Sequence, residues 1–102
     1  MHITQTKVQV LDLKCVTVDS TANGKTLAEL GVTVVPHVRE VDLTNVGDKD
    51  IYVGSNEEAA TTNSFVLVTL MSVNFRITSA AAKRLKFYCE SSSRMNVRQM
   101  GD

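Results

Sequence analysis

The sequence lacks several features that would tie it to a nucleic acid. Its 102 residues include no tryptophan, two tyrosines and three phenylalanines, and its 11 basic residues equal its 11 acidic ones, which leaves no net charge. A protein that neutralises phosphates needs a surplus of basic residues, and a site that stacks single-stranded bases needs aromatic side chains. The composition therefore argues against a nucleic-acid partner. Zero net charge also removes a repulsion that keeps copies of a chain apart.

Long apolar runs are missing as well. No stretch of the sequence approaches the roughly 18 apolar residues of a membrane-spanning helix. The first ten residues, MHITQTKVQV, show no basic start followed by an apolar block, so we expect no secretion signal. A membrane partner is therefore not expected.

Cysteine and histidine are too few and too scattered for a metal centre. Cys15 and Cys89 lie far apart in the sequence. We expect both to be reduced core residues rather than a disulfide, because a free cysteine behaves as a small apolar residue. His2 and His37 are the two histidines, and no paired spacing typical of zinc ligands occurs.

Alternation of apolar and polar residues is the strongest signal in the C-terminal two-thirds of the chain. Successive side chains of a strand point to opposite faces, so a period of two predicts strands with one packed and one solvated face. The apolar positions are Val41 and Leu43; Ile51 and Val53; Val73, Phe75 and Ile77; Leu85, Phe87 and Cys89; and Met95 and Val97. Short strands at such intervals predict an all-β fold, an antiparallel β-sandwich or barrel that is jelly-roll-like, formed by residues 1–102 as a single domain.

One short helical turn is predicted, near residues 26–30. Thr26 followed three residues later by Glu29 is a capping-box pattern, and Gly31 stands where a helix would stop. Leu27 and Leu30 would face inward together. The triple alanine in TSAAAK (residues 78–83) is expected to form a loop, because three residues between strands are too few to nucleate a helix.

Residues 1–20 are predicted to form an N-terminal strand or arm that contacts a partner subunit. The segment KVQVLDLKCVTV carries apolar residues in two phases, which requires either a bulge or a strand that is buried on both faces. One domain face can bury only one phase, so the other must meet a partner or stay exposed. The predicted interface residues here are Val8, Val10, Val16 and Val18.

A long polar excursion follows the strand-like residues 51–53. Residues 56–64 offer no core face but many amides and hydroxyls. We interpret them as a second contact with a neighbouring subunit, and a surface loop that touches nothing is the alternative. The predicted contact residues are Asn56, Glu57, Glu58, Thr61, Thr62 and Asn63.

Motifs for catalysis and ligand binding are incomplete. The segment NGKT (residues 23–26) ends like a phosphate loop, but Asp19 stands where the first glycine of that motif is required. Asp48 and Asp50 lack the further carboxylates of a calcium loop. We therefore predict no catalytic, metal-binding or cofactor-binding residue, and a protein that is not an enzyme.

From Arg39 onward, the order of motifs resembles that of small structural proteins of tailed-bacteriophage virions. In that group a TN turn, an IYVG strand, a polar stretch rich in Thr and Asn, an aromatic strand and a final V-x-V strand follow one another. The matching pieces here are Thr44-Asn45, residues 51–54, Leu85 to Tyr88, and Met95 to Arg98. The group usually has a Pro-Gly-type turn before the strand that carries Phe75. Here the apolar LVTLMSV leaves open whether residues 65–77 form one strand or two.

The resemblance implies a structural protein of a bacteriophage virion, namely a capsid decoration (cement) protein, a head-fibre base or a neck or tail accessory subunit that binds and stabilises the assembled particle. Its partners would be other copies of itself, in a homo-oligomer, and major capsid, neck or tail proteins, in a virion assembled in the host cytoplasm. Trimer, pentamer and hexamer stay open, as do head, neck and tail. The alternative is a jelly-roll binding module that recognises a carbohydrate or peptide, including a neck or tail adsorption component.

Overall fold

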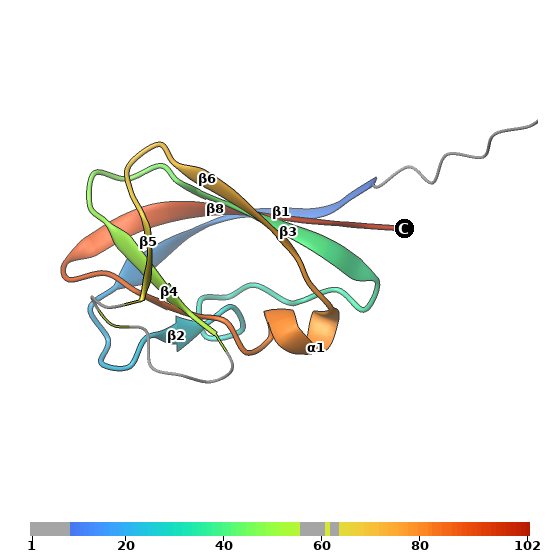
Figure 1. Ribbon diagram of the computed structural model, residues 1–102, viewed down its shortest axis with the longest axis horizontal. Coiled ribbons are helices and arrows are strands. Elements are labelled where there is room, and N and C mark those ends of the chain that lie inside the picture. Colours follow the sequence, from blue (N-terminus) through green and yellow to red (C-terminus); the bar gives the residue numbers. More distant parts are fainter. Residues whose placement is uncertain (1–8, 56–60, 62–63) are drawn as a thin grey trace, which may run out of the picture.

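The computed structural model describes residues 9–55, 61 and 64–102, which form eight strands and one short helix (Figure 1). The strands are β1 (Gln9–Asp19), β2 (Lys25–Thr26), β3 (Val38–Asn45), β4 (Ile51–Gly54), β5 (Phe65–Leu67), β6 (Ser72–Arg76), β7 (Lys86–Tyr88) and β8 (Ser92–Gly101), and the helix is α1 (Ser79–Ala82). Each segment that alternation predicts to be extended contains one of these strands.

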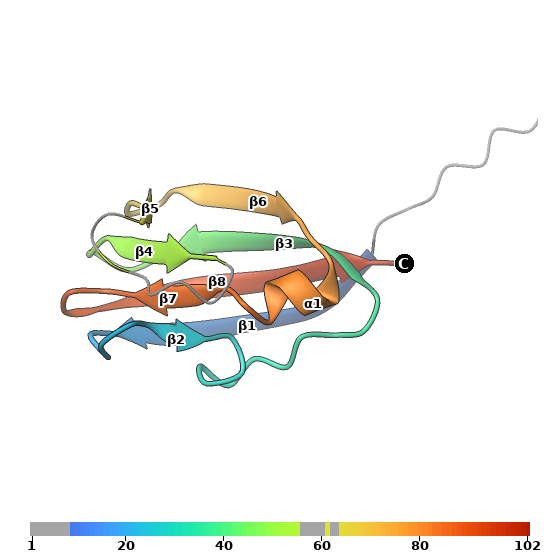
Figure 2. The ribbon, with the colours of Figure 1, turned by 60° about the horizontal axis from the view of Figure 1, so that its bottom comes forward.

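The strands form two antiparallel four-stranded sheets, in the orders β1-β8-β3-β6 and β2-β7-β4-β5, and Figure 2 shows the second sheet in front of the first. Each early strand pairs with the late strand that mirrors it: β1 with β8, β2 with β7, β3 with β6 and β4 with β5. A long hairpin, turned at the β4–β5 connection and then rolled up, gives this order, which is that of a jelly roll. The predicted all-β sandwich is confirmed, with two separate sheets rather than a closed barrel.

The core lies between the two sheets. Phe87 on β7, Leu43 on β3 and Ile51 on β4 have at most 1% of their surface exposed. Phe75 and Ile77 pack against this core while staying partly exposed. The apolar residues that alternation predicts to face inward are therefore the ones that form the core or pack against it.

Strand β1 changes phase through a bulge, one of the two possibilities that its sequence allows. The pairing with β8 shifts between Val10 and Asp12, so Leu11 is the extra residue. Beyond the bulge Val18 is fully buried, whereas Leu13 and Cys15 are exposed.

The two thiols are free, and they lie in different environments. Cys89 is buried, as predicted. Cys15 is exposed, so the prediction of a core thiol is wrong for this residue. The reason is the bulge, which places Cys15 in the outward phase of β1.

The triple alanine forms the helix α1, so the prediction of a loop there is wrong. The side chain of Thr78 caps the helix by accepting a hydrogen bond from the backbone N–H of Ala81, and Ala82 is buried against the sandwich. The cap and the burial together stabilise a turn that three alanines alone would not nucleate.

The predicted turn after Thr26 is present, although no helix is assigned to it. Glu29 Oε1 accepts from Thr26 N at 3.1 Å, and Glu29 N donates back to Thr26 Oγ1 at 3.3 Å, which completes the capping box. The hydrogen bond from Thr26 N holds the pKa of Glu29 below its ordinary value. Gly31 ends the turn with a φ of +93°, and Leu27 is fully buried.

Gln99 ties the segment between β2 and β3 to the first sheet. Its side chain is fully buried. Oε1 accepts from Val35 N at 2.9 Å, while Nε2 donates to Thr33 O at 2.9 Å and to Asp12 Oδ2 at 3.3 Å. One amide on β8 thus satisfies two backbone groups of a crossing segment that has no sheet partner of its own.

Residues 65–77 form two strands, which settles the point that the missing Pro-Gly turn left open. Strand β5 belongs to one sheet and β6 to the other. A loop at residues 68–71 carries the chain between them, at the end of the sandwich where the β3–β4 and β7–β8 connections also lie (Figure 1).

Candidate interaction surfaces

Two groups of large apolar side chains stay exposed on this sandwich, and they lie at opposite edges. Val10 and Leu13 of β1 are 52% and 65% exposed. The second group comes from residues 65–70: Phe65, Val66, Val68 and Leu70. Strand β1 is one edge of its sheet, whereas β6 and β5 are the edges at the other side of the sandwich (Figure 2).

The β1 surface, defined here by Val10 and Leu13, borders a polar hollow on the outer face of the first sheet. The hollow has a volume of about 370 Å³ and is lined by Leu13, Asp42, Asn74, Arg98 and their neighbours. Asp42 forms an ion pair with Arg98 and accepts a hydrogen bond from Asn74 Nδ2. Partial burial raises the pKa of Asp42, but the hydrogen bonds from Arg98 and Asn74 outweigh it and hold this pKa below its ordinary value.

The opposite edge is an open apolar seam between β5 and β6. The rings of Phe65 and Phe75 meet edge to face, with 6.3 Å between their centroids. Phe65 is nevertheless 45% exposed, because β5 and β6 are edge strands and no further strand covers them. Val66 lies opposite Tyr52 and points to the other face of β5, so it is exposed on the outer face of the second sheet rather than in this seam.

Leu70 is the most exposed of these apolar residues and has an unusual backbone. Its side chain is 79% exposed, and its φ is +64°. The other described non-glycine residue with a positive φ is Asn23, a residue type that tolerates this region. For a leucine, the left-handed conformation costs about 1–2 kcal/mol. The side chain recovers little of this cost through burial in its own chain.

Backbone hydrogen bonds hold the loop in this conformation. Leu70 N donates to Asn45 O at 2.8 Å, Asn45 N donates to Met71 O at 3.0 Å, and Met71 N donates to Val68 O at 2.9 Å. The loop is therefore paired to the end of β3 rather than left to solvent.

The Asn45 side chain locks the same end from inside the protein. It is fully buried, and its Nδ2 donates to Lys49 O at 2.6 Å and to Leu67 O at 2.8 Å. Its Oδ1 accepts from Gly47 N at 3.0 Å and from Ser93 Oγ at 2.8 Å. One amide thus joins the β3–β4 connection to the end of β5 and the start of β8.

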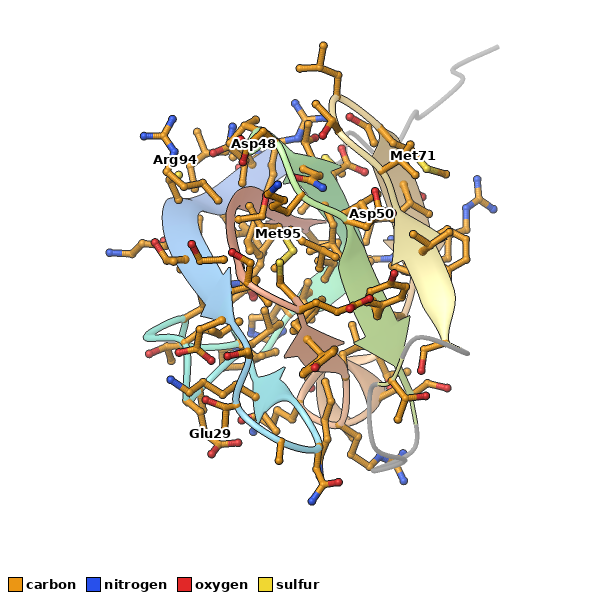
Figure 3. The ribbon with its side chains drawn as sticks, turned by 90° about the vertical axis from the view of Figure 1, so that its left-hand side faces the viewer. Glu29, Asp48, Asp50, Met71, Arg94 and Met95 are labelled. Carbon is orange, nitrogen blue, oxygen red and sulfur yellow. The ribbon has the colours of Figure 1, made fainter. Side chains whose placement is uncertain are left out.

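A hollow of about 600 Å³ lies directly beside Leu70. We call Leu70, this hollow and its rim the loop end; the lining residues are Thr17, Val46, Gly47, Asp48, Thr69, Leu70, Ser92, Ser93 and Arg94. Figure 3 looks onto this end, with Asp48 and Arg94 on its rim. Both side chains are exposed, and neither takes part in the three ion pairs found among the described residues.

The interface residues predicted from the sequence have mixed positions. Val10 is exposed and Val16 is partly buried against the core. Val18 is fully buried in its own core and has no surface left for a partner, so the prediction is wrong for Val18. Thr61 is exposed, and its N–H donates to Ser64 Oγ at 3.0 Å. The other predicted residues lie outside the described part of the chain: Val8, Asn56, Glu57, Glu58, Thr62 and Asn63.

Sequence reasoning missed Leu13 and the whole loop end. Leu13 was hidden because the position of the bulge decides which apolar phase of β1 is outward. Leu70 had no usable signal, because a turn without glycine can be a type I turn, which needs no residue in the left-handed region. Nothing in the sequence indicates that Asp48 and Arg94, far apart along the chain, share a rim.

Chemistry that would point to an active site is not evident in the part of the chain that the structure describes. Over these residues, no group of three or more His, Cys, Asp and Glu side chains is placed to hold a metal ion. Nor does any helix there have the length and apolar character to cross a membrane. Comparison with known proteins finds no matching family model, no matching curated protein and no matching solved structure.

Proposed function

We propose that this chain is a non-catalytic structural subunit of a larger assembly, and specifically an accessory or decoration subunit of a bacteriophage virion. The observation that carries the proposal is the pair of exposed apolar surfaces at opposite edges of one small sandwich. Scattered exposed apolar residues are ordinary, but grouped ones mark interaction sites. A subunit with two such sites links neighbours, whereas a protein that captures a single ligand needs one.

Both surfaces belong to fixed parts of the fold. Val10 and Leu13 project from a strand paired to β8, and Leu70 projects from a loop paired to β3. A rigid surface loses little conformational entropy when it binds, so even a modest contact area contributes to assembly. Repetition of one contact around a symmetric particle then multiplies its effect.

The sequence resemblance supports a virion as the assembly, and the fold is compatible with this choice. Jelly rolls occur in viral capsid proteins, and also in lectins and cupins, so the fold alone does not select among these functions. A decoration subunit that binds only the assembled shell stabilises the shell by linkage. We assign the shell contact to the β1 surface, because it adjoins the broad outer face of the β1-β8-β3-β6 sheet.

A binding module for a carbohydrate or peptide is the second candidate. The polar hollow beside Leu13 favours it, since Asp42, Asn74 and Arg98 offer both donors and acceptors there. No aromatic ring is among the residues that line this hollow, and sugars are commonly bound against aromatic rings. The hollow therefore supports a weaker case than the two apolar surfaces.

The test is the composition of particles produced from the genome that encodes the chain. If the proposal holds, gradient-purified tailed particles contain the protein in many copies, and added protein cosediments with particles that lack it. The double variant Val10→Ser, Leu13→Ser should keep its unfolding midpoint, because both side chains are exposed, and should lose cosedimentation. Particles without the protein, or unchanged cosedimentation of the double variant, would overturn the proposal.

A further inference from the structure

We infer that the loop end is a two-fold interface between two copies of this chain, in which Leu70 of each copy occupies the hollow of the other. The inference deepens the proposed function, since it identifies the partner at the second apolar surface. It rests on three observations: the strained backbone of Leu70, the hollow beside it and the opposite charges on the rim of that hollow.

The strain at Leu70 means that this residue does not serve the fold. Glycine would adopt a φ of +64° without steric conflict, whereas leucine pays a conformational cost there. A side chain that is 79% exposed gains almost nothing from its own core in return. The four hydrogen bonds of Asn45 nevertheless hold this end in place. A fixed apolar projection of this kind suits insertion into a partner.

The hollow supplies a complementary site on the same surface. It lies next to Leu70, and its volume of about 600 Å³ exceeds what one leucine side chain fills. In a two-fold contact both copies use the same patch. The projection of each copy can therefore fill the recess of the other, and the contact is made twice. A projection without a recess would need a different partner.

The charges on the rim favour a second copy of this chain over a partner whose surface carries charges of a single sign. Asp48 and Arg94 both line the hollow, and neither forms an ion pair within the described residues. An anionic partner would meet Asp48 unfavourably, and a cationic one would meet Arg94 unfavourably. Another copy, rotated by the two-fold axis, brings Arg94 of one chain to Asp48 of the other, twice.

The first experiment separates dimerisation from folding with Leu70→Gly. Sedimentation equilibrium of the wild-type chain should give a concentration-dependent mass that approaches twice 11.2 kDa. Leu70→Gly should stay at the monomer mass while its unfolding midpoint rises, because glycine relieves the backbone strain. The matched control is Leu13→Ser, which also removes an exposed leucine but from the other edge, and it should dimerise like the wild type.

The second experiment tests the charge pairing between copies. Asp48→Arg places two cations on the rim and Arg94→Asp places two anions there, so each variant alone should dimerise at least about tenfold more weakly than the wild type. An equimolar mixture should form dimers again, because the two cations on the rim of one variant then face the two anions on the rim of the other. Native mass spectrometry, with one variant isotopically labelled, should show the mixed dimer in excess.

Three results would each overturn the interface. They are a wild-type chain that stays monomeric at about 1 mM, where even a dimer with a Kd of about 0.1 mM is mostly formed; a Leu70→Gly chain that dimerises normally; and a mixture of the charge variants that stays monomeric. None of these results affects the particle test, which depends on Val10 and Leu13. The failure of the dimer and the failure of the virion proposal are thus distinguishable.

Discussion

The two exposed apolar surfaces of this sandwich are built in different ways. On β1, a bulge of one residue turns Val10 and Leu13 outward, and the strand keeps its pairing with β8. At the loop end, Leu70 is held in a left-handed conformation by hydrogen bonds that depend on Asn45. The first surface needs only a register shift, whereas the second needs a buried polar cluster. Replacing Val10 and Leu13 should therefore leave stability unchanged, whereas replacing Leu70 by glycine should raise it by relieving the backbone strain.

The largest expected effect comes from the core that supports both surfaces. Phe87 has 1% of its surface exposed, so Phe87→Ala loses transfer free energy and leaves a cavity. We expect the free energy of unfolding to fall by about 3–5 kcal/mol. Urea denaturation measures this directly. Phe65→Ala is the matched control, since that ring is 45% exposed, and it should cost much less. Equal losses for the two variants would mean that the open seam is in fact part of the core.

A smaller loss of stability is expected from the removal of either of two buried amides, one toward each end of the sandwich. Asn45→Ala and Gln99→Ala each remove a fully buried amide that satisfies several backbone groups. Each should cost about 2–4 kcal/mol, because buried polar groups are left without partners. The two losses should be similar in urea denaturation but should loosen different parts of the molecule.

Amide hydrogen exchange identifies those parts. Gly47 N donates to the Asn45 side chain, and Val35 N donates to the Gln99 side chain. Asn45→Ala should accelerate exchange at Gly47 and Leu70 but not at Val35, and Gln99→Ala should do the reverse. Acceleration at all three amides in both variants would show that the two ends unfold together, and would refute the separate locking of the loop end.

The strands could be predicted well from the sequence, because the alternation of apolar and polar residues follows directly from which side chains are buried. Each predicted segment from Val41 to Val97 contains a strand of the sandwich, and the capping box at Thr26 forms as expected. Helix α1 was missed because its stability comes from the Thr78 cap and the burial of Ala82, and the burial depends on the tertiary fold. Helix propensity predicts correctly that these residues would not form a helix as an isolated peptide. It does not include the tertiary contacts that stabilise the helix in this fold.

The interaction surfaces were harder to predict for the same reason. The sequence shows that β1 has two apolar phases, but the bulge at Leu11 decides that Leu13 is outward and Val18 inward. The loop end joins residues of the β3–β4 and β5–β6 connections to residues of β1 and β8, among them Asp48, Leu70 and Arg94. Only the pairing of the strands brings them together, and a single sequence carries no record of that pairing.

The smallest expected effect is a dependence on acid that belongs to the β1 side of the molecule. Hydrogen bonds from the hydroxyl of Thr21 and from Lys25, and one from Thr21 N, lower the pKa of Asp19 from 3.8 to about 2. A carboxyl group whose pKa is lower in the folded state stabilises the fold above its unfolded pKa, and this contribution is lost as the pH falls through the folded value. The urea midpoint should therefore fall between about pH 4 and pH 2 in part because of Asp19.

Asp19→Asn isolates that contribution. At pH 7 the variant should have a slightly lower midpoint than the wild type, because it has lost the charged hydrogen bonds to Thr21 and Lys25. The two midpoints should converge as the pH approaches 2, where Asp19 of the wild type takes up its proton. Asp19 pairs with Ser92 of the loop end, but its side chain is bound to Thr21 and Lys25, so Asp19→Asn should leave dimerisation through Leu70 unchanged at pH 7. A constant difference between the two midpoints across this range would mean that the residue acts through its shape rather than its charge. A change in dimerisation would mean that the hydrogen bonds of Asp19 also hold the loop end.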